Sequence, residues 1–399
     1  MKGWRRTFWV VFVANLVSGA GLMSFLPYFP TLLGELGLTD PHAIAVWSGI
    51  LFGVAPLAAA FSGPLWGSFG DRYGRKLMVV RSLFGLALFV GAMTFARTPW
   101  ELLALRILQG CFSGYMPPSL TLVSVSAPPE RTGQVTSWIQ TASTVGTILG
   151  PMLGVFLLER LDVHALFAAT GIGAGASGLA VLVFAREDAR ARAPAGRFSA
   201  SEVLRAAWRD LCALAANPAV RAAMALYAAV HFALGATQPL MEFLVEATWR
   251  GEPGEIERLT GILFSVLAIT AIVATPVWGW AGDRFGHGLA LRCASVSSAL
   301  ALVAHALAPS YAWLFAVRLL FGLASPGASA SAFGLAAATT GREQRGAAMA
   351  AVFSARSLAL AAGSFLGGTL MGFVGIRAAF ALAGAAIALA LLAGRGARQ

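Results

Sequence analysis

Five ionisable residues inside the long apolar runs of this 399-residue chain are candidates for binding a proton or for acting on a group that does. They are three arginines, a histidine and a glutamate, namely Arg106, Arg318, Arg356, His231 and Glu242. An imidazole titrates near neutrality and a carboxylate can exchange a proton, whereas a guanidinium stays charged. We therefore expect His231 first and Glu242 second to carry a proton, while Arg106 and Arg356 act on neighbouring groups.

Each of these residues also has a structural interpretation. A buried histidine can be a hydrogen-bonded interior residue, and Glu242 can lie at the membrane interface. An intramembrane arginine can bond backbone carbonyls of a broken neighbouring helix, and Arg318 repeats the position of Arg106, which favours architecture over chemistry. Apart from His231 the apolar runs hold no catalytic grouping, so we expect no enzyme and no catalytic residue.

A compact cluster of charges follows the second apolar run. It places one carboxylate among three cations, with glycines that permit a tight turn. A cluster of this kind can serve as a latch at a membrane surface, or its cations can simply anchor topology. Its characteristic residues are Gly67, Asp71, Arg72, Gly74, Arg75 and Lys76.

The composition indicates that most of the chain lies in lipid. Hydrophobic residues make up 58% of the chain and charged residues 12%, and the mean hydropathy is +0.74. A helix of about 20 apolar residues spans the hydrocarbon core, and the runs lack the alternation of barrel strands. Twelve helical spans are predicted, with approximate bounds 7–29, 45–66, 78–96, 99–123, 135–157, 164–185, 221–244, 259–280, 288–308, 311–336, 347–372 and 376–394.

The net charge of +11 reports topology rather than nucleic-acid binding. With the N-terminus inside, 21 of the 29 Lys and Arg residues fall in or beside cytoplasmic segments. This is the positive-inside pattern, so we expect a multi-pass protein of the inner membrane with both termini cytoplasmic. Cys111, Cys212 and Cys293 give neither a metal-ligand cluster nor a disulfide framework, and we expect no cofactor and no metal.

The chain contains two copies of one unit. Residues 49–76 and 261–288 are identical at 13 of 28 positions without gaps, an offset of 212 that also aligns Pro27 with Pro239. An even number of spans per copy leaves the copies parallel, related by an axis along the membrane normal, with a central site at their interface. We therefore predict an all-α membrane protein with six-helix bundles at 1–185 and 221–399, joined by a cytoplasmic linker at 186–220.

The linker is too charged to span a membrane. Its second part is predicted as a helix on the cytoplasmic surface, capped by Ser199 or Ser201, with Val203, Leu204, Ala207 and Trp208 on one face.

The motifs give the chain a resemblance to the major facilitator superfamily, and within it to twelve-span bacterial drug:proton antiporters. The charged loop matches the superfamily's cytoplasmic loop signature, in which Asp71 resembles the residue that meets a helix N-terminus of the other half. The second copy keeps Gly279, Asp283 and Arg284 but carries His287 where Arg75 stands, so we expect the first loop to dominate.

Two further motifs resemble those of antiporters, and the second of them favours efflux. In the fourth span, Arg106, Gln109 and Gly110 resemble the antiporters' Arg-x-x-x-Gly type motif, which implies a part in proton coupling. The fifth span resembles a GxxxGPxxG motif that is typical of antiporters rather than importers. An ordinary stripe of small packing residues is the alternative. That motif consists of Gly146, Gly150, Pro151 and Gly154.

The sequence departs from the family pattern because no Asp or Glu lies in the interior of its first six spans, where Glu101 stands only at the start of the fourth, and the first span carries Asn15. Coupling is therefore predicted in the second half. Mixed aromatic and amide side chains suit lipophilic or amphipathic solutes, although aromatic residues in spans commonly only pack. Our cavity candidates are Asn15, Phe112, Trp138, Gln140, Tyr227, Phe232, Gln238 and Phe353, with His231 and Arg356.

We thus expect a monomeric secondary transporter that exchanges protons for a small-molecule substrate in a lipid bilayer, most simply a drug or lipophile exporter. A transporter of a specific metabolite, such as a sugar, amino acid or lipid, is the alternative.

Overall fold

A computed structural model of the protein describes residues 3–128, 131–160, 162–187, 201–203, 205, 208–209, 212, 218–339 and 345–396. Within these ranges every regular element is a helix. The side chains of Asp71 and Phe353 lie outside the described set. The contacts divide the chain into two units, Met1–Leu26 with Leu57–Leu204 and Pro27–Pro56 with Arg205–Gln399.

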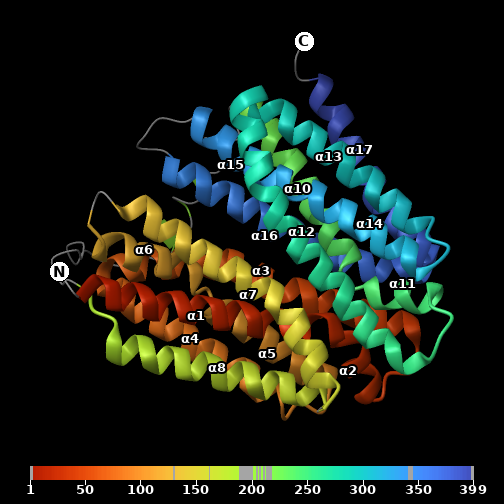
Figure 1. Cartoon of the computed structure of the whole chain (residues 1–399), viewed down its shortest axis with the longest axis horizontal. Coiled ribbons are helices and arrows are strands. Elements are labelled where there is room, and N and C mark those ends of the chain that lie inside the picture. Colours follow the sequence, from red (N-terminus) through yellow and green to blue (C-terminus); the bar gives the residue numbers. More distant parts are fainter. Residues whose placement is uncertain are drawn as a thin grey trace. The chain divides into compact units, whose positions relative to one another are not determined.

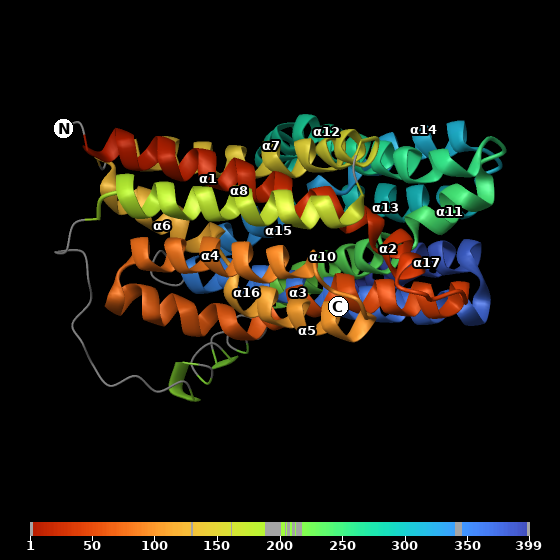
Figure 2. The same ribbon diagram turned by 90° about the horizontal axis from the view of Figure 1, so that it is seen from below.

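The first unit contains six helices of its own and the second half of α3. In both views α1, α4 and α8 run side by side, and α7 packs along α1 (Figures 1 and 2). The helices are α1 (Gly3–Phe25), α3 (Pro41–Tyr73, shared), α4 (Arg75–Met93), α5 (Pro99–Phe112), α6 (Met116–Ser126), α7 (Thr132–Leu158) and α8 (Val163–Phe184).

The second unit is built around α10, which packs on α16 and α17, and around α13, which packs on α14, α15 and α17. Two 3-10 turns join its segments. Its elements are η1 (Leu26–Tyr28), α2 (Phe29–Glu35), α10 (Pro218–Thr237), α11 (Met241–Thr248), η4 (Pro253–Glu255), α12 (Ile256–Phe285), α13 (His287–Ala306), α14 (Tyr311–Ala324), α15 (Pro326–Thr339), α16 (Arg345–Val374) and α17 (Ile376–Gly396).

Most of the predicted spans are present as helices. In the described part of the chain, 10 helical segments are long and apolar enough to cross a membrane, or 11 if the bent pair α10–α11 counts as one span. The predicted span 99–123 is not one continuous helix, because α5 and α6 are separated at residues 113–115. Twelve spans therefore remain a prediction, whereas a multi-pass helical membrane protein is established.

The breaks fall at prolines and glycines. The separation of α5 from α6 contains Gly114, and Pro117 and Pro118 stand in the first turn of α6, where a missing N–H costs no helical bond. Pro239 stands at the bend of 57° between the helical segments on either side of it, and the aligned Pro27 lies in η1, between α1 and α2. Both copies of the repeat thus interrupt their first span at the same proline.

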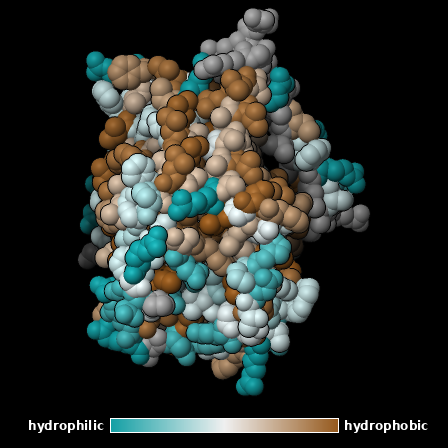
Figure 3. Space-filling view, turned by 90° about the vertical axis from the view of Figure 1, so that its right-hand side faces the viewer, coloured by the Kyte–Doolittle hydropathy of each residue, from teal (hydrophilic) through white to brown (hydrophobic). Residues whose placement is uncertain are grey.

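The surface carries many apolar side chains, as lipid contact requires. Phe95 and Phe373 are 80% and 78% exposed. On the face that Figure 3 displays, brown patches mark hydrophobic residues at the surface. In the linker, residues 201–203, 205, 208–209 and 212 are helical and Trp208 is exposed, whereas Ser199, Leu204 and Ala207 lie outside the described residues. A surface position for this helix stays a prediction.

Candidate transport site

The first unit holds Arg106 in a chain of polar side chains. Arg106 is 2% exposed, and its guanidinium donates to Gln109 Oε1. The Gln109 amide donates in turn to Ser113 Oγ at 3.1 Å, and Ser113 is the residue that follows the last residue of α5. The structure therefore brings two predicted coupling residues into contact and adds Ser113. The spacing of three and then four residues, which keeps side chains on one helix face, was the signal for Ser113.

Phe112 packs among aromatic and small residues of the same unit. Its ring centroid lies 5.5 Å from those of Trp66 and Phe89, and a Cβ on Gly85 would meet the Phe112 Cβ at 2.8 Å. The Trp66 indole donates to the Cys111 carbonyl at 2.7 Å. These contacts fix the end of α5 beside Ser113, so Phe112 supports the polar chain by packing.

The small residues of the predicted antiporter motif bring α7 against α1. A Cβ at Gly146 would collide with the Leu16 carbonyl, and one at Gly150 would meet the Ala20 carbonyl at 2.5 Å. Pro151 lies inside α7, and Gly154 is buried. The motif thus supports close backbone packing, which is the structural role expected of small residues spaced four apart.

His231 belongs to a cluster in the second unit. Its Nδ1 lies 3.1 Å from the Tyr227 carbonyl, and the two rings meet edge to face at 4.4 Å. Arg356 lies close enough to act electrostatically on both groups. Tyr227 is 1% exposed and also contacts Phe333. The structure therefore assembles two predicted coupling residues and one predicted cavity residue around a buried imidazole.

Glu242 connects segments that lie 211 positions apart in the sequence. The Thr31 hydroxyl of α2 donates to Glu242 Oε1 at 3.0 Å, within the second unit. Glu242 Oε2 and the hydroxyl oxygen of the fully buried Tyr28 have no hydrogen-bond partner among the described residues. A charged carboxylate accepts from Thr31 more strongly than a neutral carboxyl, which keeps one acceptor oxygen and gains an O–H donor, so protonation of Glu242 would weaken this contact without abolishing it.

The first half of α3 packs on α16 through residues without bulky side chains. A Cβ on Gly49 would collide with the Ser364 carbonyl, and one on Gly53 would meet the Ala361 carbonyl at 2.8 Å. A Cβ on Gly368 would collide with the Ala45 carbonyl. These contacts join a helix of the first sequence copy to one of the second, and they form a glycine seam inside the second unit.

The charged loop uses a partner that the sequence did not reveal. Gly74 has φ 108° and precedes α4, and the backbone N–H groups of Arg75 and Lys76 donate to the Glu187 carboxylate at 2.8 and 3.1 Å. An anion at a helix N-terminus satisfies free N–H groups and complements the helix dipole. Glu187 lies 111 and 112 positions away, so no local pattern predicted the pairing.

The second copy of this loop is built differently. Gly286 has φ 92° before α13, and His287 Nε2 lies 3.5 Å from Asp283 Oδ1. The His287 ring fills the space beside Gly282 and Gly334, where a Cβ would collide with it. A histidine thus occupies the position of Arg75, as the sequence comparison predicted, and it packs against small residues.

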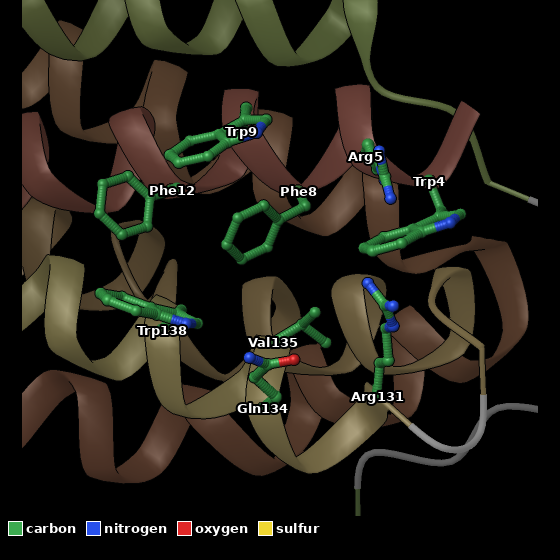
Figure 4. Close-up of a pocket in the computed structure, with 9 residues that line it drawn as sticks. All are labelled: Trp4, Arg5, Phe8, Trp9, Phe12, Arg131, Gln134, Val135 and Trp138. Carbon is green, nitrogen blue, oxygen red and sulfur yellow. The ribbon is translucent and has the colours of Figure 1, made fainter. Parts of the chain in front are cut away.

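The remaining cavity candidates divide between the two units. Asn15 is 1% exposed and its amide donates to the Val11 carbonyl at 2.8 Å, whereas Trp138 and Gln140 are exposed. Phe232 and Gln238 are half-buried, Gln238 at the bend after α10. Trp138 also borders a pocket of about 380 Å³ between α1 and α7 (Figure 4). The joint cavity stays a prediction.

Comparisons with known proteins agree with this architecture. A family model described as the Major Facilitator Superfamily matches residues 11–250 and 253–397. Multidrug resistance protein MdtG of Proteus mirabilis is 26% identical over 80% of this chain and 78% of its own length. MdtG of Enterobacter lignolyticus is 28% identical over 80% and 75%.

Solved structures share the fold. A bacterial homologue of the human lysosomal transporter Spinster superposes with a TM-score of 0.79 at 15% identity, over 99% of this chain and 98% of that one. The human organic anion transporter MFSD10 gives 0.71 at 20% identity, over 98% and 99%. The family resemblance predicted from the loop and the fifth span is confirmed.

Proposed function

Because this chain belongs to the major facilitator superfamily and is therefore a membrane transporter rather than an enzyme, we propose that it exports lipophilic or amphipathic compounds in exchange for protons. The observation that carries the choice of substrate class is the similarity to MdtG proteins over 80% of the chain. The predicted antiporter motif on α7 supports the same direction of transport. We place the protein in the inner membrane with both termini cytoplasmic.

Alternating access requires contacts that can separate and re-form. The glycine seam between α3 and α16 suits this role, because at Gly49, Gly53 and Gly368 the two helices meet through backbone carbonyls. The Thr31–Glu242 hydrogen bond also joins the two sequence copies, within the second unit. Both contacts support a mechanism in which a pair of copies rocks around a central site, as parallel repeats permit.

We assign the coupling proton to Glu242 first and to His231 second, which reverses the order expected from the sequence. The Glu242 carboxylate joins residues of both sequence copies, so binding a proton there changes a contact between them. The His231 imidazole is held by the carbonyl of Tyr227 on its own helix. A coupling group must bind its proton differently in the two facing states, and Glu242 has a contact that can differ between them.

The decisive experiment uses purified protein in proteoliposomes with an imposed proton gradient and a panel of lipophilic cations, neutral lipophiles, sugars and amino acids. We expect gradient-driven movement of several unrelated lipophilic compounds and none of the sugars or amino acids. Movement of one metabolite alone would establish the alternative, a metabolite transporter of the same family. Equal transport with and without the imposed proton gradient would contradict proton coupling.

A further inference from the structure

A pocket of about 380 Å³ in the first unit has cationic side chains at one end and aromatic side chains along its sides. It lies between the first turns of α1 and the beginning of α7, and Arg5 and Arg131 stand at its border. Figure 4 shows the Arg131 side chain extending from α7 toward Arg5 and Trp4 on α1. The Arg5 guanidinium lies 5.7 Å from the Trp4 ring centroid. Two cations thus converge at one end of the pocket.

The rest of the pocket is apolar. Phe8 and Phe12 extend from α1 toward α7, and Trp138 lies opposite them (Figure 4). Trp138 follows Arg131 by seven residues, so the aromatic wall reaches about 10 Å along the helix from the cationic end. Trp9 and Trp138 are 59% and 50% exposed, so the pocket opens outward and is not enclosed.

The arrangement matches an amphiphile with a negative head. Lys and Arg near a cytoplasmic membrane surface attract anionic lipid headgroups, and Trp residues prefer the same interfacial depth. A soluble anion would gain nothing from the aromatic walls, whereas an acyl chain gains from each apolar group it covers. Both helix ends lie on the side predicted to be cytoplasmic.

We propose that this pocket binds one anionic phospholipid of the cytoplasmic leaflet. The phosphate lies between Arg5 and Arg131, and the first part of one acyl chain lies against Phe8, Phe12 and Trp138. The volume accommodates only this part of the molecule, and the remainder stays in the bilayer. The inference rests on the predicted topology and is independent of the transported substrate.

Native mass spectrometry of the purified protein tests the site, with phosphatidylglycerol and phosphatidylcholine offered at equal concentration. We expect retention of phosphatidylglycerol in the wild type and about tenfold weaker retention in Arg5→Gln/Arg131→Gln, because each cation contributes a small but additive attraction. The matched control is Arg6→Gln/Arg209→Gln, which removes two cations from the same predicted side without touching the pocket, and it should retain the lipid. Phe12→Ala should also weaken retention.

Equal retention in the Arg5→Gln/Arg131→Gln variant and its control would overturn the proposal, as would equal retention of the two lipids. Displacement of phosphatidylglycerol by millimolar inorganic phosphate alone would overturn it in favour of a site for free anions. If the double variant does not fold, the single variants Arg5→Gln and Arg131→Gln must each reduce retention. A variant that loses drug transport but still retains phosphatidylglycerol would count against the proposed transport function and not against this lipid site.

Discussion

The two copies of the repeat carry an arginine at the same position and surround it differently. Arg106 is bonded to Gln109, which continues to Ser113. Arg318 is fully buried, donates through Nε to the Leu263 carbonyl at 3.3 Å and lies 5.5 Å from the centroid of the Phe264 ring. Both of its terminal nitrogens are without a hydrogen-bond partner among the described residues.

The residues around the second arginine explain the difference. Phe321 stands where Gln109 stands in the first copy, and its ring meets His305 edge to face at 6.1 Å. His305 also stacks on Phe380, so aromatic rings surround this part of α13. The first copy therefore holds its cation by side chains that can exchange partners, and the second holds it by a backbone carbonyl and aromatic rings.

This contrast shows that a repeated position need not have repeated surroundings. The bonded side chains of the first copy permit a change of hydrogen bonds during transport, whereas the contact of Arg318 with Leu263 attaches α14 to α12. The second copy carries protonatable groups elsewhere, in His231 and Glu242, while the only acid in the predicted spans of the first copy is Glu101, at the start of the fourth span. We infer that Arg106 of the first copy and Glu242 of the second copy have separate roles in transport.

The largest expected effect concerns Glu242. Glu242→Gln keeps an oxygen that can accept from Thr31 but cannot exchange a proton, so proton-driven accumulation should be abolished while ligand affinity changes less than about threefold. Substrate-induced proton release from purified protein provides the measurement. His231→Gln is the matched variant on the preceding helix, and we expect partial release from it. Normal release from both single variants and from the double variant would place coupling outside the second copy.

The next test compares the two arginines directly. Arg106→Met leaves Gln109 Oε1 without its donor and should reduce transport at least about tenfold, which corresponds to about 1.4 kcal/mol in the barrier. Arg318→Met removes a buried charge with few partners and conserves volume, so transport should change less than about twofold. Transport by equal amounts of correctly inserted protein is measured for both. Equal losses would refute the division of roles.

A smaller difference is expected between the two charged loops. Asp71→Asn should leave insertion intact and reduce transport severalfold, whereas Asp283→Asn should have a mild effect, because one charge biases a two-state equilibrium without holding the fold together. Insertion is followed by surface labelling and transport by the gradient assay. Equal and mild effects would mean that neither loop acts as a latch.

The sequence predicted those features that depend on local composition. The apolar runs located eleven of the spans. The glycines of α7 predicted close helix packing, and Gly146 and Gly150 do lie against the backbone of α1. The break at residues 113–115 was missed because hydropathy continues across it, although Gly114 and Pro117 signalled it.

Tertiary partners were beyond such patterns. Thr31 and Glu242 are 211 positions apart, and nothing around either residue indicates the other. Phe321 beside His305 likewise depends on how α13 and α14 pack, which alignment of the two copies does not determine. The sequence therefore supplied the ionisable groups, and the fold supplied the partners that distinguish them.

The smallest expected effect concerns the carboxylate that caps α4. Glu187 accepts from the N–H groups of Arg75 and Lys76, whereas in the described part of the chain no side chain accepts from the first N–H groups of α13, which begins after Gly286. Loss of a helix cap costs about 1 kcal/mol, so Glu187→Ala should speed hydrogen exchange of the amides at the start of α4 about fivefold. The start of α13 provides an internal control and should not change, and Glu187→Gln, which retains one acceptor oxygen, should give a smaller increase. Unchanged exchange at the start of α4 would mean that the contact with Glu187 contributes no stability there, and the two loops would then differ in sequence but not in how their helices begin.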